Sequence, residues 1–183
     1  LWGRWQRRPY DPGPGRVAPD EPEQMDVAAG PAAIPVDDYA LTPLADFRIR
    51  ARVLARRRYR LGREADLSPI DLALGWGPMS DNAITGQLNI TQSNRWYHYR
   101  WKDAPPIDPV LIVRNSANTH LVPADDNIES KLFKVRKGEI VRLEGYLISA
   151  RDSSGGSWSS SLTREDSGAN SCELMWVTGV AFE

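Results

Sequence analysis

Cysteine and histidine, the residues that build covalent and metal-held frameworks, are scarce in this sequence. It contains one cysteine, Cys172, and two histidines, His98 and His120. A disulfide needs two thiols, and structural zinc sites use several Cys or His ligands. An internal disulfide and a thiolate or His-rich metal site are therefore excluded, and we assign the chain no metal and no cofactor.

Long apolar runs, a large net charge and catalytic motifs are also lacking. The 183 residues carry 23 Lys and Arg against 24 Asp and Glu, a formal charge of −1, so the whole molecule is no polycation built to coat nucleic acid. No apolar run approaches the roughly 20 residues of a spanning helix. Neither a Gly-x-Ser-x-Gly elbow nor a glycine-rich phosphate loop occurs. We therefore assign no catalytic residues and favour a protein that is not an enzyme.

The first 43 residues differ in composition from the rest. They hold eight of the 14 prolines, at positions 9, 12, 14, 19, 22, 31, 35 and 43. Proline and glycine prevent regular structure, and such a segment has few apolar side chains to bury. We predict an extended tail or linker over residues 1–43 and one β-barrel domain over residues 44–183.

Aromatic and basic residues alternate at the start of the chain. Trp2 and Trp5 lie beside Arg4, Arg7 and Arg8. Indoles and cations of this kind flank membrane spans at the headgroup level. We expect an apolar segment upstream that anchors the protein in a membrane, whereas the alternative is a truncated chain with a basic end. The arginines favour the cytoplasmic side by the positive-inside rule.

Alternating apolar residues from Phe47 to Leu61 predict a long, half-buried strand. Two further strands around residues 88–91 and 95–101 form a predicted hairpin, and a strand over residues 139–149 carries Gly145 where a bulge or barrel corner is expected. A short helix is predicted over residues 69–74, and a second one, capped by Asp125 or Asp126, follows with Ile128 on its apolar face. A last strand covers residues 173–180.

This order of elements predicts a mainly β fold. A helix between the third and fourth strands plugs one end of an OB-type barrel. We therefore expect a small antiparallel OB-like barrel with one inserted helix and short helical turns. A β-sandwich is the alternative.

Arginines dominate the other face of the first long strand. Eight of them and no acidic residue fall between positions 48 and 63. We name Arg48, Arg50 and Arg52 as candidate binding residues, because such a ribbon carries a strong local positive field. The alternative is a solvated face whose arginines pair with Glu144 or with acidic residues of the tail.

The segment RWYHYRW, residues 95–101, places Trp96, His98 and Arg100 on one face of its strand. Aromatic rings beside cations suit single-stranded nucleic acid or a sugar polymer. The same set suits a protein contact, because Trp and Arg are enriched in interface hot spots. The alternative is plain packing.

A polar run from Asn115 to Asp126 contains Asn118 and His120. Amides, hydroxyls and carboxylates near a histidine could support a general base with an orienting partner. We include Asn118 and His120 among the candidate binding residues and keep a hydrolase centred on His120 as an alternative. Asn and Ser in a loop more often satisfy backbone groups.

Three segments resemble those of a bacterial family of conserved proteins without assigned function. They are LSPIDLALGWGPMSD (residues 67–81), SANTHLVPAD (residues 116–125) and SLTR (residues 161–164). The resemblance covers about residues 40–180. It implies an apolar N-terminal segment followed by a Pro-rich stretch, and therefore a membrane-anchored protein on the periplasmic side, with the cytoplasmic side as the alternative. It supplies no catalytic residues.

The function predicted from the sequence is a non-enzymatic binding or assembly module of the bacterial envelope. It would contact a protein partner, which could be embedded in the membrane, through its Trp- and Arg-bearing faces. An OB-type binder of nucleic acid or another polyanion is the second hypothesis, using Arg48, Arg50, Arg52, Trp96 and Arg100. The hydrolase is the third.

Overall fold

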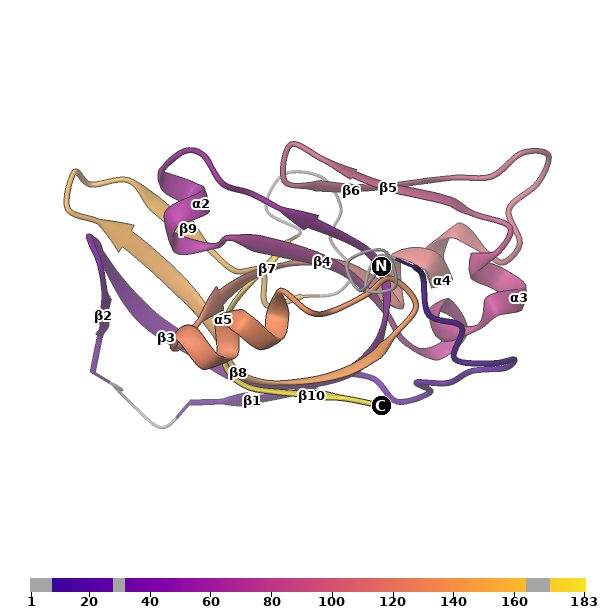
Figure 1. Ribbon diagram of the computed structural model, residues 1–183, viewed down its shortest axis with the longest axis horizontal. Coiled ribbons are helices and arrows are strands. Elements are labelled where there is room, and N and C mark those ends of the chain that lie inside the picture. Colours follow the sequence, from indigo (N-terminus) through magenta and orange to yellow (C-terminus); the bar gives the residue numbers. More distant parts are fainter. Residues whose placement is uncertain (1–7, 28–31, 164–171) are drawn as a thin grey trace.

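The computed structural model describes residues 8–27, 32–163 and 172–183, and these residues form a mainly β structure (Figure 1). The strands are β1 (Glu23–Asp26), β2 (Ile34–Val36), β3 (Tyr39–Arg58), β4 (Ile70–Gly75), β5 (Asn89–Ser93), β6 (Trp96–Arg100), β7 (Ser116–Pro123), β8 (Ile140–Asp152), β9 (Ser157–Ser159) and β10 (Glu173–Phe182). The helices are α2 (Arg63–Leu67), α3 (Asn82–Thr85), α4 (Pro109–Arg114) and α5 (Asp126–Leu132), with a 3₁₀ turn η1 (Gly77–Ser80).

Five strands close into a ring, in the order β3, β4, β7, β10, β8 and back to β3. Neighbours are antiparallel except β7 and β10, which run parallel. The helix α5 lies between β7 and β8 in the chain, where an OB-type barrel carries its plug. The predicted OB-like barrel is confirmed.

Alternation of side chains along the strands builds the barrel interior. Phe47, Ile49 and Val53 of β3 and Leu143 of β8 are all buried in one apolar cluster. α5 adds Ile128 to the same cluster. The Asp125 carboxylate accepts a hydrogen bond from the Ile128 backbone N–H at 2.8 Å, so the predicted helix cap is confirmed.

The irregularity predicted at Gly145 is confirmed as a close approach of two strands. A Cβ atom at this position would lie 1.9 Å from the Trp176 carbonyl oxygen, and the pairing of β8 with β10 shifts register between Val177 and Gly179. Only glycine allows the two backbones to approach this closely.

Two short segments differ from the sequence-based prediction. The short helix predicted over residues 69–74 is wrong, because residues 70–75 form strand β4. The polar run after Asn115, expected to be a loop, contains strand β7. β4 is buried on both faces, and short apolar runs of this kind cannot be assigned from periodicity alone. Pairing with β3 and β7 decides in favour of a strand.

The described part of the Pro-rich segment lies along the barrel. β1 and β2 both pair with β3 (Figure 1). Ala18 is fully buried, and its carbonyl oxygen accepts a hydrogen bond from the Gly77 N–H. β3 begins at Tyr39, so the predicted boundary between residues 43 and 44 falls inside a strand. The segment is extended, but part of it belongs to the folded domain.

The chain between β4 and β7 folds back over the outside of the barrel, and we call residues 76–115 the insertion. Its β5–β6 hairpin lies above β4 in Figure 1. The predicted hairpin is confirmed, and its inward side chains, including Ile90, Tyr97 and Tyr99, pack with Leu54 of β3 and Ala73 of β4. The outer surface of β4 is therefore covered.

Candidate functional site

A carboxylate and an imidazole face each other across β4 and β7, on the outer surface of the barrel. Asp71 is the register partner of His120. The even positions 70, 72 and 74 of β4 point into the core, so residue 71 points outward. Asp71 is fully buried and His120 nearly so. Nδ1 of His120 lies 3.0 Å from Oδ1 of Asp71, but the ring N–H is not aligned with that oxygen. The two side chains are therefore in close contact without an aligned hydrogen bond.

Arg95, at the tip of the β5–β6 hairpin, completes this network. Asn94 and Arg95 have φ angles of 50° and 67°, the left-handed pair of a type I′ turn. This turn directs the Arg95 side chain onto the barrel, where Nη1 donates to Oδ1 of Asp71 at 2.7 Å. The oxygen of Asp71 is thus shared by a guanidinium and an imidazole.

The backbone and side chain of Arg95 are held on several sides. Its N–H donates to the Tyr59 hydroxyl at 3.1 Å, and its carbonyl accepts from the Asn118 amide at 3.0 Å. The guanidinium carbon lies 3.7 Å from the centroid of the Tyr59 ring, and Nε is 3.8 Å from the Glu64 carboxylate. Burial raises the pKa of Tyr59, and the charge of Asp71 adds to this effect. Tyr59 therefore stays a neutral donor and acceptor.

A cavity of about 400 Å³, here called the Arg95 pocket, opens beside this network. Its walls come from α2, the hairpin tip, β7 and β9. Its lining includes Glu64, Arg95, Trp96, His120, Trp158, Cys172 and the serines 157, 159 and 160. The rings of His120 and Trp158 lie 4.7 Å apart between centroids. The pocket therefore combines a fixed cation, an imidazole and two indoles.

The arrangement can hold a ligand with polar and aromatic surfaces. Arg95 supplies a positioned donor, the indoles supply stacking area, and the serines supply small polar groups. A histidine next to a buried carboxylate is also the arrangement that orients a general base. Among the described residues, no group of three or more His, Cys, Asp and Glu side chains is placed to hold a metal ion.

The predicted residues fall into separate parts of the structure. Asn118 and His120 lie in or beside the network, and Trp96 lines the Arg95 pocket. His98 and Arg100 are exposed on the outer face of β6, as the alternation predicted. The role of these residues in binding stays a prediction.

The three candidate arginines of β3 lie away from the Arg95 pocket, and two of them bond within the protein. Arg50 forms a bidentate pair with the carboxylate of Glu183 and donates to the Val17 carbonyl oxygen. Arg52 donates to Ser80 and Thr85. Arg48 is exposed and opposite Glu144 in the ladder with β8. The arginine ribbon thus stabilises the packing of the tail, the insertion and the C-terminal residues.

Sequence reasoning missed Asp71, Arg95, Tyr59 and Trp158. One signal for Asp71 was present, because it is the only charged residue between Pro69 and Gly75. A carboxylate in such an apolar run requires a buried partner. Arg95 carries no comparable signal, since its role depends on how the hairpin folds back.

Comparison with protein-family models, with curated proteins and with solved structures finds no match. The resemblance stated above therefore stays a prediction. Every helix in the described ranges falls short of the length and apolar character that a membrane crossing requires. Four of the five residues of the predicted membrane-boundary signature lie outside the described residues, and the fifth, Arg8, is exposed.

Proposed function

We propose that this chain is a non-enzymatic binding or assembly module, and that it contacts a protein partner through the Arg95 pocket and the adjoining Trp96. The observation that carries the proposal is the pocket itself, which a rigidly held arginine lines together with two tryptophans. Trp and Arg in a partly desolvated pocket are the residues that contribute most to protein interfaces.

Preorganisation supports the same conclusion. Ordering a long side chain on binding costs roughly 0.5–1.5 kcal/mol. The contacts with Asp71, Glu64 and Tyr59 already order Arg95 in the free protein. A partner that inserts an anchoring side chain here would avoid most of that cost.

The proposal extends to the location. We infer a membrane-anchored protein on the periplasmic side, held by a segment upstream of Leu1. The support for anchoring is the Trp and Arg pattern at the start of the sequence, which is typical of membrane boundaries. The support for the periplasmic side is the family resemblance alone, since the arginines by themselves favour the cytoplasmic side. Sequencing the residues before Leu1 tests this directly, because an apolar stretch of about 20 residues is expected there.

Trp96, the first residue of β6, and Trp101, the residue that follows its end, provide a matched pair of variants. Trp96 and Trp101 each expose 36% of their surface, but only Trp96 lines the Arg95 pocket. The tagged full-length protein is purified from detergent-solubilised membranes as wild type, W96A and W101A. We expect a partner that is retained by wild type and W101A and lost by W96A, with similar melting temperatures for all three.

Two outcomes would overturn the proposed function. One is a protein that elutes alone under every mild condition. The other is the same set of proteins with W96A as with wild type, because the Arg95 pocket would then play no part in their binding.

A hydrolase centred on His120 is the second candidate, favoured by the contact between His120 and Asp71 at the wall of a pocket. It requires turnover of a simple ester, such as a p-nitrophenyl acyl ester, that is abolished in His120→Ala while the fold is kept. The binding module predicts no turnover by wild type.

The OB-type nucleic-acid hypothesis has less support. OB-folds bind oligonucleotides on the face of their second and third strands, which correspond to β4 and β7. The insertion covers β4 on this face, and Arg50 and Arg52 bond internal groups. Fluorescence anisotropy with labelled single strands at low and physiological salt tests it, because such binding weakens steeply with salt.

A further inference from the structure

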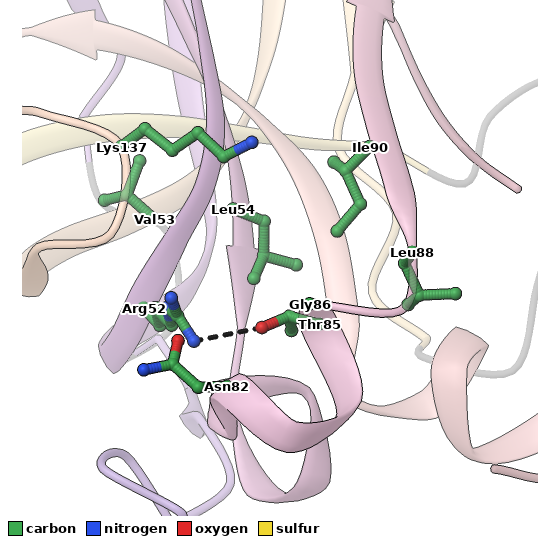
Figure 2. A pocket seen from close by; sticks show the side chains of 9 residues that line it. All are labelled: Arg52, Val53, Leu54, Asn82, Thr85, Gly86, Leu88, Ile90 and Lys137. Atoms are coloured by element: carbon green, nitrogen blue, oxygen red, sulfur yellow. Dashed lines mark hydrogen bonds between the residues drawn. The ribbon is translucent and has the colours of Figure 1, made fainter. Parts of the chain in front are cut away.

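A second cavity, here called the Arg52 pocket, lies between β3, α3, β5 and the turn before β8 (Figure 2). Its volume is about 260 Å³, slightly below the roughly 300–1,000 Å³ of pockets for drug-sized ligands. It shares no residue with the lining of the Arg95 pocket. Any ligand of this cavity is therefore small, and it would occupy a site distinct from the Arg95 pocket.

Arg52 supplies a half-buried cation to this cavity. Its Nη1 donates to the Thr85 hydroxyl at 3.0 Å and to the Ser80 carbonyl at 3.3 Å. Both acceptors are neutral, and Arg52 forms no ion pair within the described residues. A half-buried guanidinium without a contacting anion is unusual, because its desolvation lowers the stability of the fold.

Two carboxylates act on Arg52 from a distance, but neither is the contacting anion that its guanidinium lacks. Burial lowers the pKa of Arg52, whereas the charges of Asp11 and Asp81 raise it. Asp11 accepts hydrogen bonds from Asn82 and Gly13, and Asp81 accepts one from the Ala83 backbone. Their oxygens therefore serve the loop and α3, and the guanidinium keeps donors for another acceptor.

Lys137 adds a second cation, and apolar side chains separate the two. Lys137 is exposed and forms no ion pair with a described residue. In Figure 2 its ammonium extends along the upper side of the pocket and Arg52 lies at the lower side, with Leu54 between them. Leu88 and Ile90 form the right-hand wall. The cavity is thus cationic at its rim and apolar along its wall.

We propose that the Arg52 pocket binds a small carboxylate that carries an apolar body. The carboxylate would lie near Arg52 and Lys137, and the apolar body would pack on Leu54, Leu88 and Ile90. Inorganic phosphate fits less well, because it would leave the apolar wall exposed to water. A free acid and the C-terminal residue of a peptide share this chemistry, and the experiment distinguishes the two sources.

The test uses 3-phenylpropionate, its neutral amide 3-phenylpropionamide, and an acetylated tripeptide ending in leucine, each titrated into the full chain and followed by NMR amide shifts. For a ligand of this size we expect a dissociation constant on the order of 1 mM. The shifts should be centred on Leu88, Ile90 and Thr85. The amide should bind at least about fivefold more weakly, since it loses the charge-assisted contacts. Tighter binding of the tripeptide than of the free acid would identify a peptide C-terminus as the source, and the reverse would identify a free acid.

Lys137→Gln and Lys134→Gln form the matched pair of variants. Both lysines are exposed, but only Lys137 lines the pocket, so Lys137→Gln should weaken the acid roughly fivefold and Lys134→Gln should leave it unchanged. Arg52→Gln is avoided, because Arg52 also holds α3. The proposal is overturned by the absence of saturable shifts at about 10 mM acid, roughly tenfold above the expected dissociation constant. Equal binding of acid and amide, or equal effects of the two lysine variants, would overturn it as well.

Discussion

Replacing Asp71 with asparagine is the sharpest test of the network beneath the hairpin. Asp71 is fully buried and contacts Arg95 at 2.7 Å and His120 at 3.0 Å. The substitution keeps the size and shape of the side chain and removes its charge. Arg95, whose side chain is 14% exposed, is then left with Glu64 at 3.8 Å, a carboxylate that is 70% exposed. An exposed partner of this kind compensates little.

The magnitude follows from the cost of leaving a buried charge without its partner. Removing one member of a buried ion pair costs about 3–5 kcal/mol. Arg95 is partly exposed and keeps its contact with the Tyr59 ring, so we expect the lower end, about 3 kcal/mol. For a domain of this size each kcal/mol lowers the melting temperature by about 2–4 °C. The variant should therefore melt roughly 6–12 °C below wild type.

Urea unfolding of Asp71→Asn, Arg95→Gln and the double variant provides the measurement. If the two side chains interact directly, the double variant should cost less than the sum of the single variants by about 1–3 kcal/mol. A matched control is Arg100→Gln, at an exposed position of the same hairpin. Additive costs, or a loss below about 1 kcal/mol for Asp71→Asn, would refute the buried pair.

Four further changes test the barrel and its surroundings. Leu143→Ala should cost about 2–5 kcal/mol in urea unfolding, because it leaves a cavity in the barrel interior. Gly145→Ala should prevent regular β8–β10 pairing and lower the melting temperature strongly, since its Cβ would overlap the Trp176 carbonyl. Burial raises the pKa of Tyr97 above its ordinary value near 10, so the folded chain keeps a proton that the unfolded chain releases. Stability should therefore fall above about pH 10, the ordinary tyrosine pKa. In melts between about pH 9 and 11, one unit either side of that value, Tyr97→Phe should lose less stability than wild type. Deleting residues 1–27 should cost about 2 kcal/mol or more, because the β1–β3 hydrogen bonds are lost.

Leu61→Ala, at a position that is 93% exposed, should change stability little. A Gly145→Ala variant with wild-type stability would mean that the two strands separate easily. Equal alkaline curves for Tyr97→Phe and wild type would show that the hydroxyl is accessible in the folded state. A truncated chain as stable as the full one would show that the tail only rests on β3, as the composition of the tail predicted.

Local chemistry explains which elements could be predicted. The alternation from Phe47 onward specifies one face of β3 by itself, and Asp125 caps α5 through a hydrogen bond only three residues away. Gly145 is visible because glycine is unfavourable in a strand unless something requires it. Each of these signals is contained in a few neighbouring residues, and together they were enough to predict the OB-like barrel.

Tertiary contacts explain the failures. Ser68 and Pro69 are favourable residues for a helix start, yet Ile70 and Leu72 pack in the barrel as part of a strand. His120 was noticed as a polar residue in a loop, but its position on β7 depends on pairing with β4. Arg95 bonds to Asp71, which lies 24 residues away in the sequence, and no local pattern indicates such a contact.

The insertion explains why the proposed binding surface is at the hairpin tip. In a simple OB barrel the outer face of β4 and β7 would be free for a ligand. Here the hairpin covers part of that face, so its polar groups must be satisfied within the protein. Arg95 supplies a partner for Asp71, and Gln92 donates to the Asn118 amide oxygen at 2.6 Å.

These internal bonds determine what a ligand can still reach. Asp71 and Asn118 are occupied by the hairpin, whereas His120 and Trp158 remain at the wall of the Arg95 pocket beside the chain of β6. In the proposed binding module, specificity would therefore be set by the hairpin tip and β9, which differ from the strand face that an uncovered barrel would use. Because Arg95 both closes the strand face and lines the pocket, the residue that holds the hairpin in place also fixes the shape of the site.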